Sequence, residues 1–238
     1  LYLSGDPHPG PRDLFVVWAG ANDYFGYFDN TKSLPSNNVA ALTGIFTGAN
    51  GPVTQAIANL TNDIERLAAV GAKNFVVPNL PNLGATPDYN GSPTTSVPAT
   101  LIAALHNQAL ASTMHALQQQ LGVNITVVDI HTVFDDVLAN PAKYGIDPAH
   151  TTDQCILNPT CVAQQLHYIF WDGVHPTGFL QQVLSEVYFS SLSGPTTVGP
   201  AMESEPITQS RLLAHISARD AGLRLGAAGL AIDNVGGM

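Results

Sequence analysis

The segment Asp172-Gly173-Val174-His175-Pro176 contains the residue types best suited to acid–base chemistry in this chain. An aspartate and a histidine three residues apart on a tight loop can meet side chain to side chain. The carboxylate would accept a hydrogen bond from one imidazole nitrogen, which leaves the other nitrogen to take a proton from a hydroxyl nucleophile. Pro176 would restrict the loop. In the alternative interpretation Asp172 caps a helix and His175 is incidental, and the spacing alone favours neither.

The segment Gly20-Ala21-Asn22-Asp23 is the second candidate. The side-chain amide of Asn22, at the end of a strand, could donate a hydrogen bond to a developing oxyanion. Gly20 would let a substrate approach the backbone closely. Taken alone, the Asn22-Asp23 pair is more typical of a turn, because both residue types favour turns.

Both segments follow apolar runs, and the pattern of such runs along the chain predicts an α/β fold. The continuous run 13–19 indicates a strand buried on both faces of a parallel sheet. Further strands are predicted at 74–77 and 125–130, helices at 52–70, 98–121, 132–139 and 177–190, and long loops at 26–51 and 82–98. In open parallel sheets, ligands bind at the carboxyl ends of the strands, where both candidate segments would lie.

Two stretches, Trp-Ala-Gly-Ala-Asn-Asp-Tyr-Phe at 18–25 and Phe-Trp-Asp-Gly-Val-His-Pro-Thr at 170–177, together resemble signature blocks of the GDSL, or SGNH, family of serine esterases and lipases. The stretches around His106-Asn107 and at 71–81 and 140–145 fit the same family, so the resemblance covers roughly residues 1–190.

The resemblance implies a flavodoxin-like three-layer α/β/α sandwich with a parallel sheet. It also implies ester hydrolysis through an acyl-serine intermediate, without a metal or nucleotide cofactor. Carried over residue by residue, it makes Asn22 the oxyanion-hole donor, His175 the general base and Asp172 the carboxylate that orients His175.

The family's Gly-Asp-Ser nucleophile block is absent from the sequence, and so is the glycine of its second block. Ser4-Gly5-Asp6 has the letters in reverse, and Ser4 is not expected to be a nucleophile. We therefore expect the chain to be the C-terminal portion of a longer hydrolase and to be inactive alone. With the strand order 2-1-3-4-5, the missing strands would lie beside Leu14–Ala19, which would be left as an exposed edge open to association.

Two other classes of function are considered. A non-catalytic module that binds an ester or a glycan on a degenerate hydrolase fold would explain the missing serine, although the Asn22 and Asp172/His175 blocks argue against it. A metal hydrolase is disfavoured because the histidines are scattered, with no His-Glu-x-x-His or comparable spacing, so no metal site is predicted.

The composition restricts the partners. Lys and Arg number 8 against 18 Asp and Glu, and the net charge of −10 argues against binding nucleic acid or an anionic membrane surface. No apolar run is long enough for a transmembrane segment. The expected partner is a small-molecule or lipid ester.

The two cysteines and the C-terminal composition give two further expectations. Cys155 and Cys161 predict a short-loop disulfide, which favours a secreted or extracytoplasmic protein. We expect a hydrolase-like domain at 1–193. A tail at 194–238 would follow, comprising a linker and an amphipathic helix at 207–225.

Overall fold

The structure, a computed structural model, describes residues 3–5, 7–30, 34–35, 38–163 and 167–193. Contacts within the chain divide it into two units, Leu1–Leu184 and Ser185–Met238. The fold and the candidate site described below belong to the first unit. The predicted linker and the predicted helix at 207–225 lie outside the described residues.

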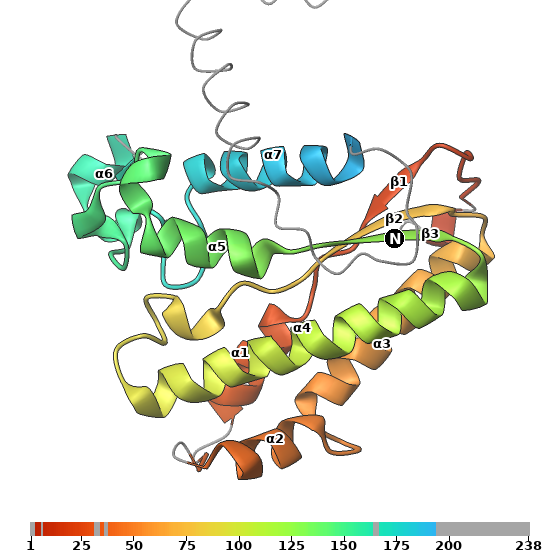
Figure 1. The fold of residues 1–238 in the computed structure, drawn as a ribbon, viewed down its shortest axis with the longest axis horizontal. Helices are drawn as coiled ribbons and strands as arrows, with labels where there is room; N and C mark the ends of the chain where they lie inside the picture. Colours follow the sequence, from red (N-terminus) through yellow and green to blue (C-terminus); the bar gives the residue numbers. More distant parts are fainter. Residues whose placement is uncertain (1–2, 6, 31–33, 36–37, 164–166, 194–238) are drawn as a thin grey trace, which may run out of the picture. The chain divides into compact units, whose positions relative to one another are not determined.

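The first unit is built on a parallel sheet of strands β1 (Leu14–Val16), β2 (Asn74–Pro78) and β3 (Asn124–Val128), in that spatial order (Figure 1). Phe75 in the central strand lies opposite Phe15 on one side and Ile125 on the other. This arrangement confirms the predicted α/β class with a parallel sheet. The third strand is shorter than predicted, because helix α5 (Ile130–Ala139) begins directly after the cap residue Asp129.

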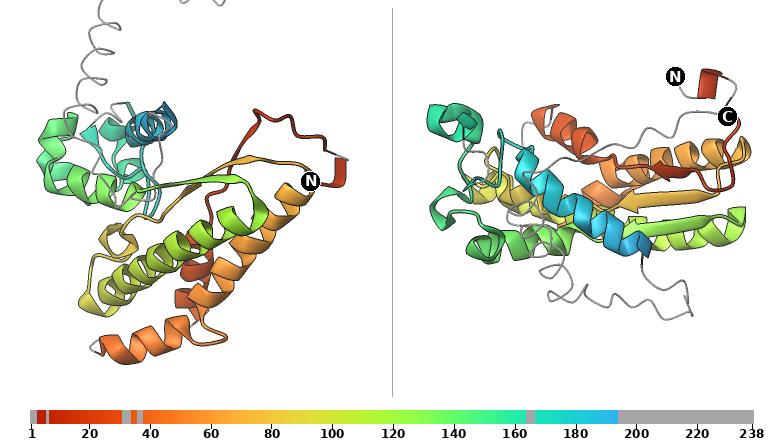
Figure 2. Two further views of the ribbon diagram at one scale, coloured as in Figure 1. Left: turned by 45° about the vertical axis from the view of Figure 1, so that its right-hand side comes forward. Right: turned by 90° about the horizontal axis from the view of Figure 1, so that it is seen from above.

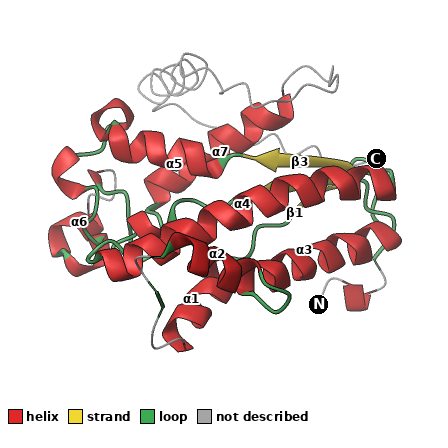
Figure 3. Cartoon of the chain, turned by 60° about the horizontal axis from the view of Figure 1, so that its bottom comes forward, coloured by secondary structure: helices red, strands yellow, loops and turns green. Residues whose placement is uncertain are grey.

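Helices α3 (Pro52–Ala69) and α4 (Pro93–Leu121) run side by side along one face of the sheet (Figures 2 and 3). Their apolar sides and the β2 residues Phe75 and Val77 belong to one extensive buried cluster. Helix α3 matches its predicted range closely. Helix α4 begins earlier than predicted because the hydroxyl of Ser92 accepts a hydrogen bond from Thr94 N and caps it, so Pro98 lies inside the helix.

Two helices occupy most of the region 26–51, where the sequence predicted a loop. Helix α1 spans Ala21–Asn30 and helix α2 spans Val39–Thr47. Leu42 and Phe46, separated by one helical turn, are fully buried, and the side chain of Asn38 caps α2 by accepting from Ala41 N at 3.0 Å. The loop prediction was wrong because both helices are short, so neither spans enough turns to show a clear helical period.

Strand β1 corrects a second prediction, that the run 13–19 is buried on both faces. Phe15 and Val17 pack against the buried cluster, but Leu14, Val16 and Trp18 are 45, 60 and 44 % exposed. In the described part of the chain β1 pairs with β2 alone and is therefore an edge strand. One apolar face of this strand lies open to solvent.

The remaining elements of the first unit follow β3. Short 3-10 turns and helix α6 (Pro159–Ala163) lead to the run 168–171, which forms isolated β-bridges rather than a strand of the sheet. Helix α7 (Gly178–Ser193) comes next, and its first turns, up to Leu184, belong to this unit and bury Leu180, Val183 and Leu184. Within the described residues, no helix has the length and apolarity needed to cross a membrane.

Candidate active site

The Asp172–His175 loop brings its two titratable side chains into direct contact. His175 Nδ1 lies 2.8 Å from Asp172 Oδ2 and 3.0 Å from Oδ1. Because a carboxylate only accepts hydrogen bonds, this contact assigns the proton to Nδ1 in the neutral imidazole. Nε2 of the same ring is then an acceptor, on a side chain that is 67 % exposed. The arrangement is able to take a proton from a hydroxyl group placed beside Nε2.

The carboxylate of Asp172 also organises the backbone of its own loop. Oδ1 accepts hydrogen bonds from the amides of Val174 at 2.9 Å and His175 at 2.7 Å. Partial burial acts to raise the pKa of Asp172, but these hydrogen bonds, the hydrogen bond to the His175 ring and the charge of His175 together lower it below its ordinary value. Asp172 is thus stabilised as the anion that accepts the hydrogen bond from His175.

The loop stands on a small framework that includes a disulfide. Phe170 forms an antiparallel β-bridge with Pro176 and a parallel β-bridge with Gln154. Trp171 N donates a hydrogen bond to His175 O at 2.8 Å. Cys155 N and Ile156 N donate to the carbonyls of Phe170 and Trp171 at 3.0 and 2.8 Å. The disulfide Cys155–Cys161, which the sequence predicted, closes the segment that makes these two bonds.

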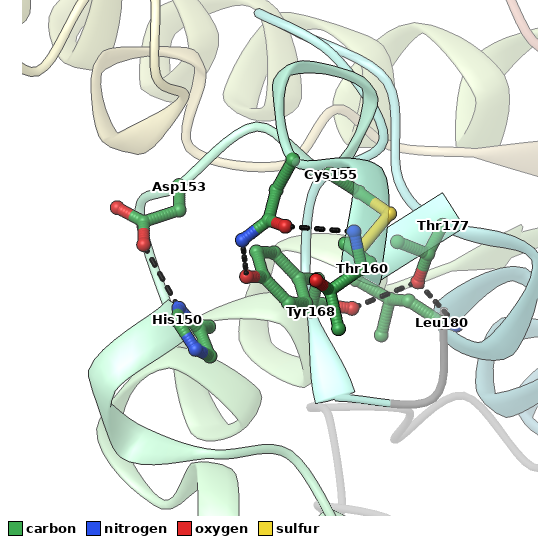
Figure 4. Close-up of a disulfide and its surroundings, with 9 residues drawn as sticks. His150, Asp153, Cys155, Thr160, Tyr168, Thr177 and Leu180 are labelled. Carbon is green, nitrogen blue, oxygen red and sulfur yellow. Dashed lines mark hydrogen bonds and ion pairs between the residues drawn. A yellow bond between two sulfur atoms is a disulfide. The ribbon is translucent and has the colours of Figure 1, made fainter. Parts of the chain in front are cut away.

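Figure 4 shows Tyr168 near this disulfide, with its backbone carbonyl joined to Thr177 by a hydrogen bond. The hydroxyl of Thr177 donates to Tyr168 O at 2.9 Å, and Asn158 Nδ2 donates to the Tyr168 hydroxyl at 2.8 Å. Thr177 itself is fully buried. The residues on both sides of the Asp172–His175 loop are therefore fixed by hydrogen bonds.

Asn22 is helical and exposed, near the N-terminus of α1. It does not lie in the non-helical turn that the Asn22-Asp23 pair alone suggested. Gly20, directly before the helix, has φ +119°, a conformation that residues with a side chain rarely adopt. A Cβ at Gly20 would also lie 2.8 Å from His106 Cε1. Glycine is therefore required where the chain passes from β1 into α1.

The side chains of Tyr24 and His106 form a buried pair. The hydroxyl of Tyr24, in α1, is 2.6 Å from Nδ1 of His106, in α4, and both residues are fully buried. Burial lowers the pKa of His106 to about 4 and raises the pKa of Tyr24 above its usual range. His106 Nε2 is buried with no hydrogen-bond partner within the described residues. The neutral His106–Tyr24 pair joins α1 to α4.

Polar residues at the carboxyl ends of the strands link neighbouring loops, a role that was not predicted from the sequence. Trp18 Nε1 donates to Asn79 O at 3.2 Å, and the Asn79 side chain donates to Asp129 and accepts from His131 N, both at 2.9 Å. Asn107 both donates to and accepts from the backbone of Leu80 at 2.8 Å. The available signal was the presence of Asn79 and Asn107 in stretches that fit the family.

The structure places the predicted site residues on two separate elements. Asp172 and His175 share one loop, whereas Asn22 lies on α1 and shares no hydrogen bond with either of them. Ser4 lies in a 3-10 turn, Leu3–Gly5, before β1. The described residues contain no group of three or more His, Cys, Asp or Glu side chains able to hold a metal ion.

Comparisons with known proteins identify the family. The GDSL-like lipase/acylhydrolase family matches residues 9–186. The chain is 26 % identical over 206 residues to an uncharacterized protein in the trpE-trpG intergenic region of Pseudomonas putida, a match that covers 82 % of this chain and 31 % of that protein. It is 26 % identical over 185 residues to a GDSL esterase/lipase of Arabidopsis thaliana, covering 70 % and 46 % of the two chains.

A third relative is the phosphatidylcholine-sterol acyltransferase of Aeromonas hydrophila, which is 29 % identical over 138 residues and covers 57 % of this chain and 34 % of the relative. The matches thus span between about a third and a half of the lengths of these relatives. Since the family match extends over most of the sequence, from the segment before β1 into α7, the chain belongs to the GDSL-like lipase/acylhydrolase family.

Proposed function

We propose that this chain carries the acid–base pair and one oxyanion donor of a serine esterase or lipase. The single observation that carries the proposal is the contact at 2.8 Å between His175 Nδ1 and the Asp172 carboxylate, which leaves Nε2 free on an exposed side chain. In this function His175 is the general base, Asp172 orients it, and the Asn22 side-chain amide donates to the oxyanion.

The reaction proceeds in two halves. A serine Oγ attacks the ester carbonyl carbon while its proton passes to His175 Nε2, and the negative charge gathers on the carbonyl oxygen beside Asn22. Collapse of this intermediate breaks the bond to the alcohol, which leaves with the proton from His175. Water then attacks the acyl-serine with His175 again as base, and the acid and the free serine are released.

We propose that the serine comes from outside these 238 residues, because the Gly-Asp-Ser block is absent from the sequence. The segment that bears it would pair with the free edge of β1, where Leu14 and Val16 are 45 and 60 % exposed. An open apolar edge of this kind favours the addition of a strand. The 238-residue chain alone would lack acyl-enzyme chemistry.

The substrate class we propose is a small-molecule or lipid ester. The relatives named as an esterase/lipase and as a phosphatidylcholine-sterol acyltransferase support acyl chemistry of this kind. The disulfide Cys155–Cys161 supports an oxidising, extracytoplasmic location. The family match ends at residue 186, which supports placing the tail, 194–238, outside the catalytic domain.

The test is hydrolysis of p-nitrophenyl esters by the chain alone and by the chain fused to the Gly-Asp-Ser segment of a GDSL relative. We expect no serine-dependent hydrolysis from the chain alone. We expect hydrolysis from the fusion, lost roughly a thousandfold or more on His175→Ala. His115→Ala is the matched control, because His115 lies on the exposed side of α4.

Two outcomes would overturn the proposal. Robust hydrolysis by the unfused chain, with a serine-directed reagent bound to one of its own residues, would show that it contains a nucleophile. A folded fusion that binds esters or glycans through Asn22 without hydrolysing them would favour the non-catalytic binding module.

A further inference from the structure

We propose that Asp88 and Tyr89 are positioning residues that set the spacing between the His175 loop and the helix that carries Asn22. The inference rests on the proposed function, since it gives both segments a role in one reaction. These two adjacent residues form a bridge, because Asp88 contacts the His175 loop and Tyr89 contacts α1.

Asp88 contacts the loop at Gly173. Its backbone amide donates to Gly173 O at 3.0 Å, and its carboxylate occupies the place that a Cβ on Gly173 would take. Gln154 Nε2 approaches the same carboxylate at 3.4 Å. Gly173 is buried and lies between Asp172 and Val174. Any side chain at position 173 must therefore displace either Asp88 or the loop that holds Asp172 and His175.

Tyr89 contacts α1 through aromatic packing. Its ring stacks on Phe25 with centroids 5.3 Å apart and an interplanar angle of 17°, and it lies 5.6 Å from the ring of Phe28. Phe25 follows Asn22 by nearly one turn of the same helix. A shift of Tyr89 thus acts directly on the part of α1 that presents the Asn22 amide.

The bridge is itself anchored, so it can transmit a displacement. Tyr89 N donates to Thr86 O at 3.0 Å, and the buried Thr86 hydroxyl donates to Leu83 O at 2.7 Å. The Thr95 hydroxyl, in α4, donates to Tyr89 O at 2.8 Å. Asp88 and Tyr89 therefore belong to one fixed turn, and the two segments of the site, which share no hydrogen bond, are both packed against it.

The primary test is a size exchange between positions 88 and 173, read by NMR on the folded chain. Gly173→Ala should shift the side-chain amide resonance of Asn22 and the imidazole resonances of His175. The double variant Asp88→Ala/Gly173→Ala removes the atoms that the new Cβ would meet and should return the Asn22 resonance to its original position. Gly91→Ala is the matched control, because a Cβ there meets nothing within 4 Å.

Tyr89 supplies the second arm. Tyr89→Ala removes the ring that packs on Phe25 and should shift the His175 imidazole resonances, although His175 lies on another element. Tyr89→Phe keeps the ring and should leave them in place. In the fusion that carries a nucleophile, Gly173→Ala should lower kcat roughly tenfold to a hundredfold with KM nearly unchanged, and the double variant should recover kcat.

The proposal is overturned if the Asn22 resonance in Gly173→Ala moves no more than in Gly91→Ala, or if the double variant shows no recovery while it remains folded. These NMR results do not require catalysis. A fusion that fails to hydrolyse esters would count against the proposed function alone. Active fusions in which Gly173→Ala leaves the Asn22 resonance in place would count against the bridge alone.

Discussion

The Asp172–His175 loop and the start of α1 differ in how far along the chain their supporting contacts reach. Asp172 bonds to Val174 and His175, and Trp171 bonds to His175, so most of the loop is defined within a few residues. The start of α1 depends on Tyr24 contacting His106, 82 residues away. One candidate segment is organised by local hydrogen bonds and the other by burial against a distant helix.

This difference separates what each segment contributes to stability from what it contributes to chemistry. A buried aromatic pair is costly to disturb, because its removal leaves a cavity or an unpaired polar atom. A surface loop organised by its own carboxylate can lose that carboxylate with little effect on the rest of the fold. Substitutions at the start of α1 should therefore affect unfolding strongly, and those in the loop should affect the histidine.

The largest effect is expected for Tyr24→Ala. Tyr24 is fully buried among the helices, and truncating a buried aromatic residue costs about 3–5 kcal/mol of unfolding free energy. Urea denaturation measures this loss. Tyr24→Phe keeps the ring but leaves His106 Nδ1 without its partner, and should cost about 1–3 kcal/mol. A loss below 1 kcal/mol for Tyr24→Ala would show that α1 is not stabilised by burial.

The second effect is a pH dependence that arises from His106. Burial lowers its folded-state pKa to about 4, against 6.5 for an ordinary histidine, so the unfolded chain binds the proton first. The contribution that the neutral His106 makes to the free energy of unfolding is fully present above pH 6.5. It falls as the pH decreases towards 4, by about 3 kcal/mol in total. Urea denaturation at several pH values should show this slope in the wild type. His106→Gln should remove that part of the slope, and an unchanged slope would contradict the assignment.

The third effect concerns Gly20, where the positive φ and the contact with His106 both oppose a side chain. Gly20→Ala should destabilise the fold by about 2–3 kcal/mol. Gly26→Ala, inside α1 with nothing within 4 Å of the added Cβ, should instead stabilise it by about 0.5–1 kcal/mol. Thermal or urea unfolding of the two variants gives opposite signs if the account is correct.

The smallest effect on stability is expected in the loop. In Asp172→Asn the side-chain oxygen can still accept from Val174 N and His175 N, so the unfolding free energy should fall by less than about 1 kcal/mol. The neutral amide no longer favours the proton on His175 Nδ1, and the tautomer population should change. Nitrogen-15 chemical shifts of His175 measure that population. An unchanged tautomer population would show that Asp172 does not determine which nitrogen of His175 carries the proton.

The same contrast explains how much could be predicted from the sequence. The spacing of Asp172 and His175 allowed both a side-chain contact and a capping role for Asp172, and the contact itself was established only by the structure. The helix under Asn22 was missed, since its support comes from Tyr24 meeting His106 in α4, and no local pattern reports a partner that distant. The catalytic roles of these residues and the source of the serine remain predictions.

The layers of the fold divide in a similar way. The strands of the sheet and α3 were predicted because continuous apolar runs and a regular helical period are strong signals. Helix α2 was missed although Asn38 caps it and Leu42 and Phe46 anchor it, because a short helix offers only two such positions. The bridge at Asp88 and Tyr89 depends on side chains that meet only after folding.

The edge position of β1 has a consequence for hydrogen exchange. Val17 N donates to Val76 O in β2, and alternate residues of a strand direct their amides to the same side, so the amides of Leu14 and Val16 face away from β2. In the isolated chain these two amides should exchange with deuterium quickly while Val17 exchanges slowly. When another strand is added along this edge, protection should spread to every residue of β1, which makes the exchange pattern a direct readout of whether the sheet has been extended.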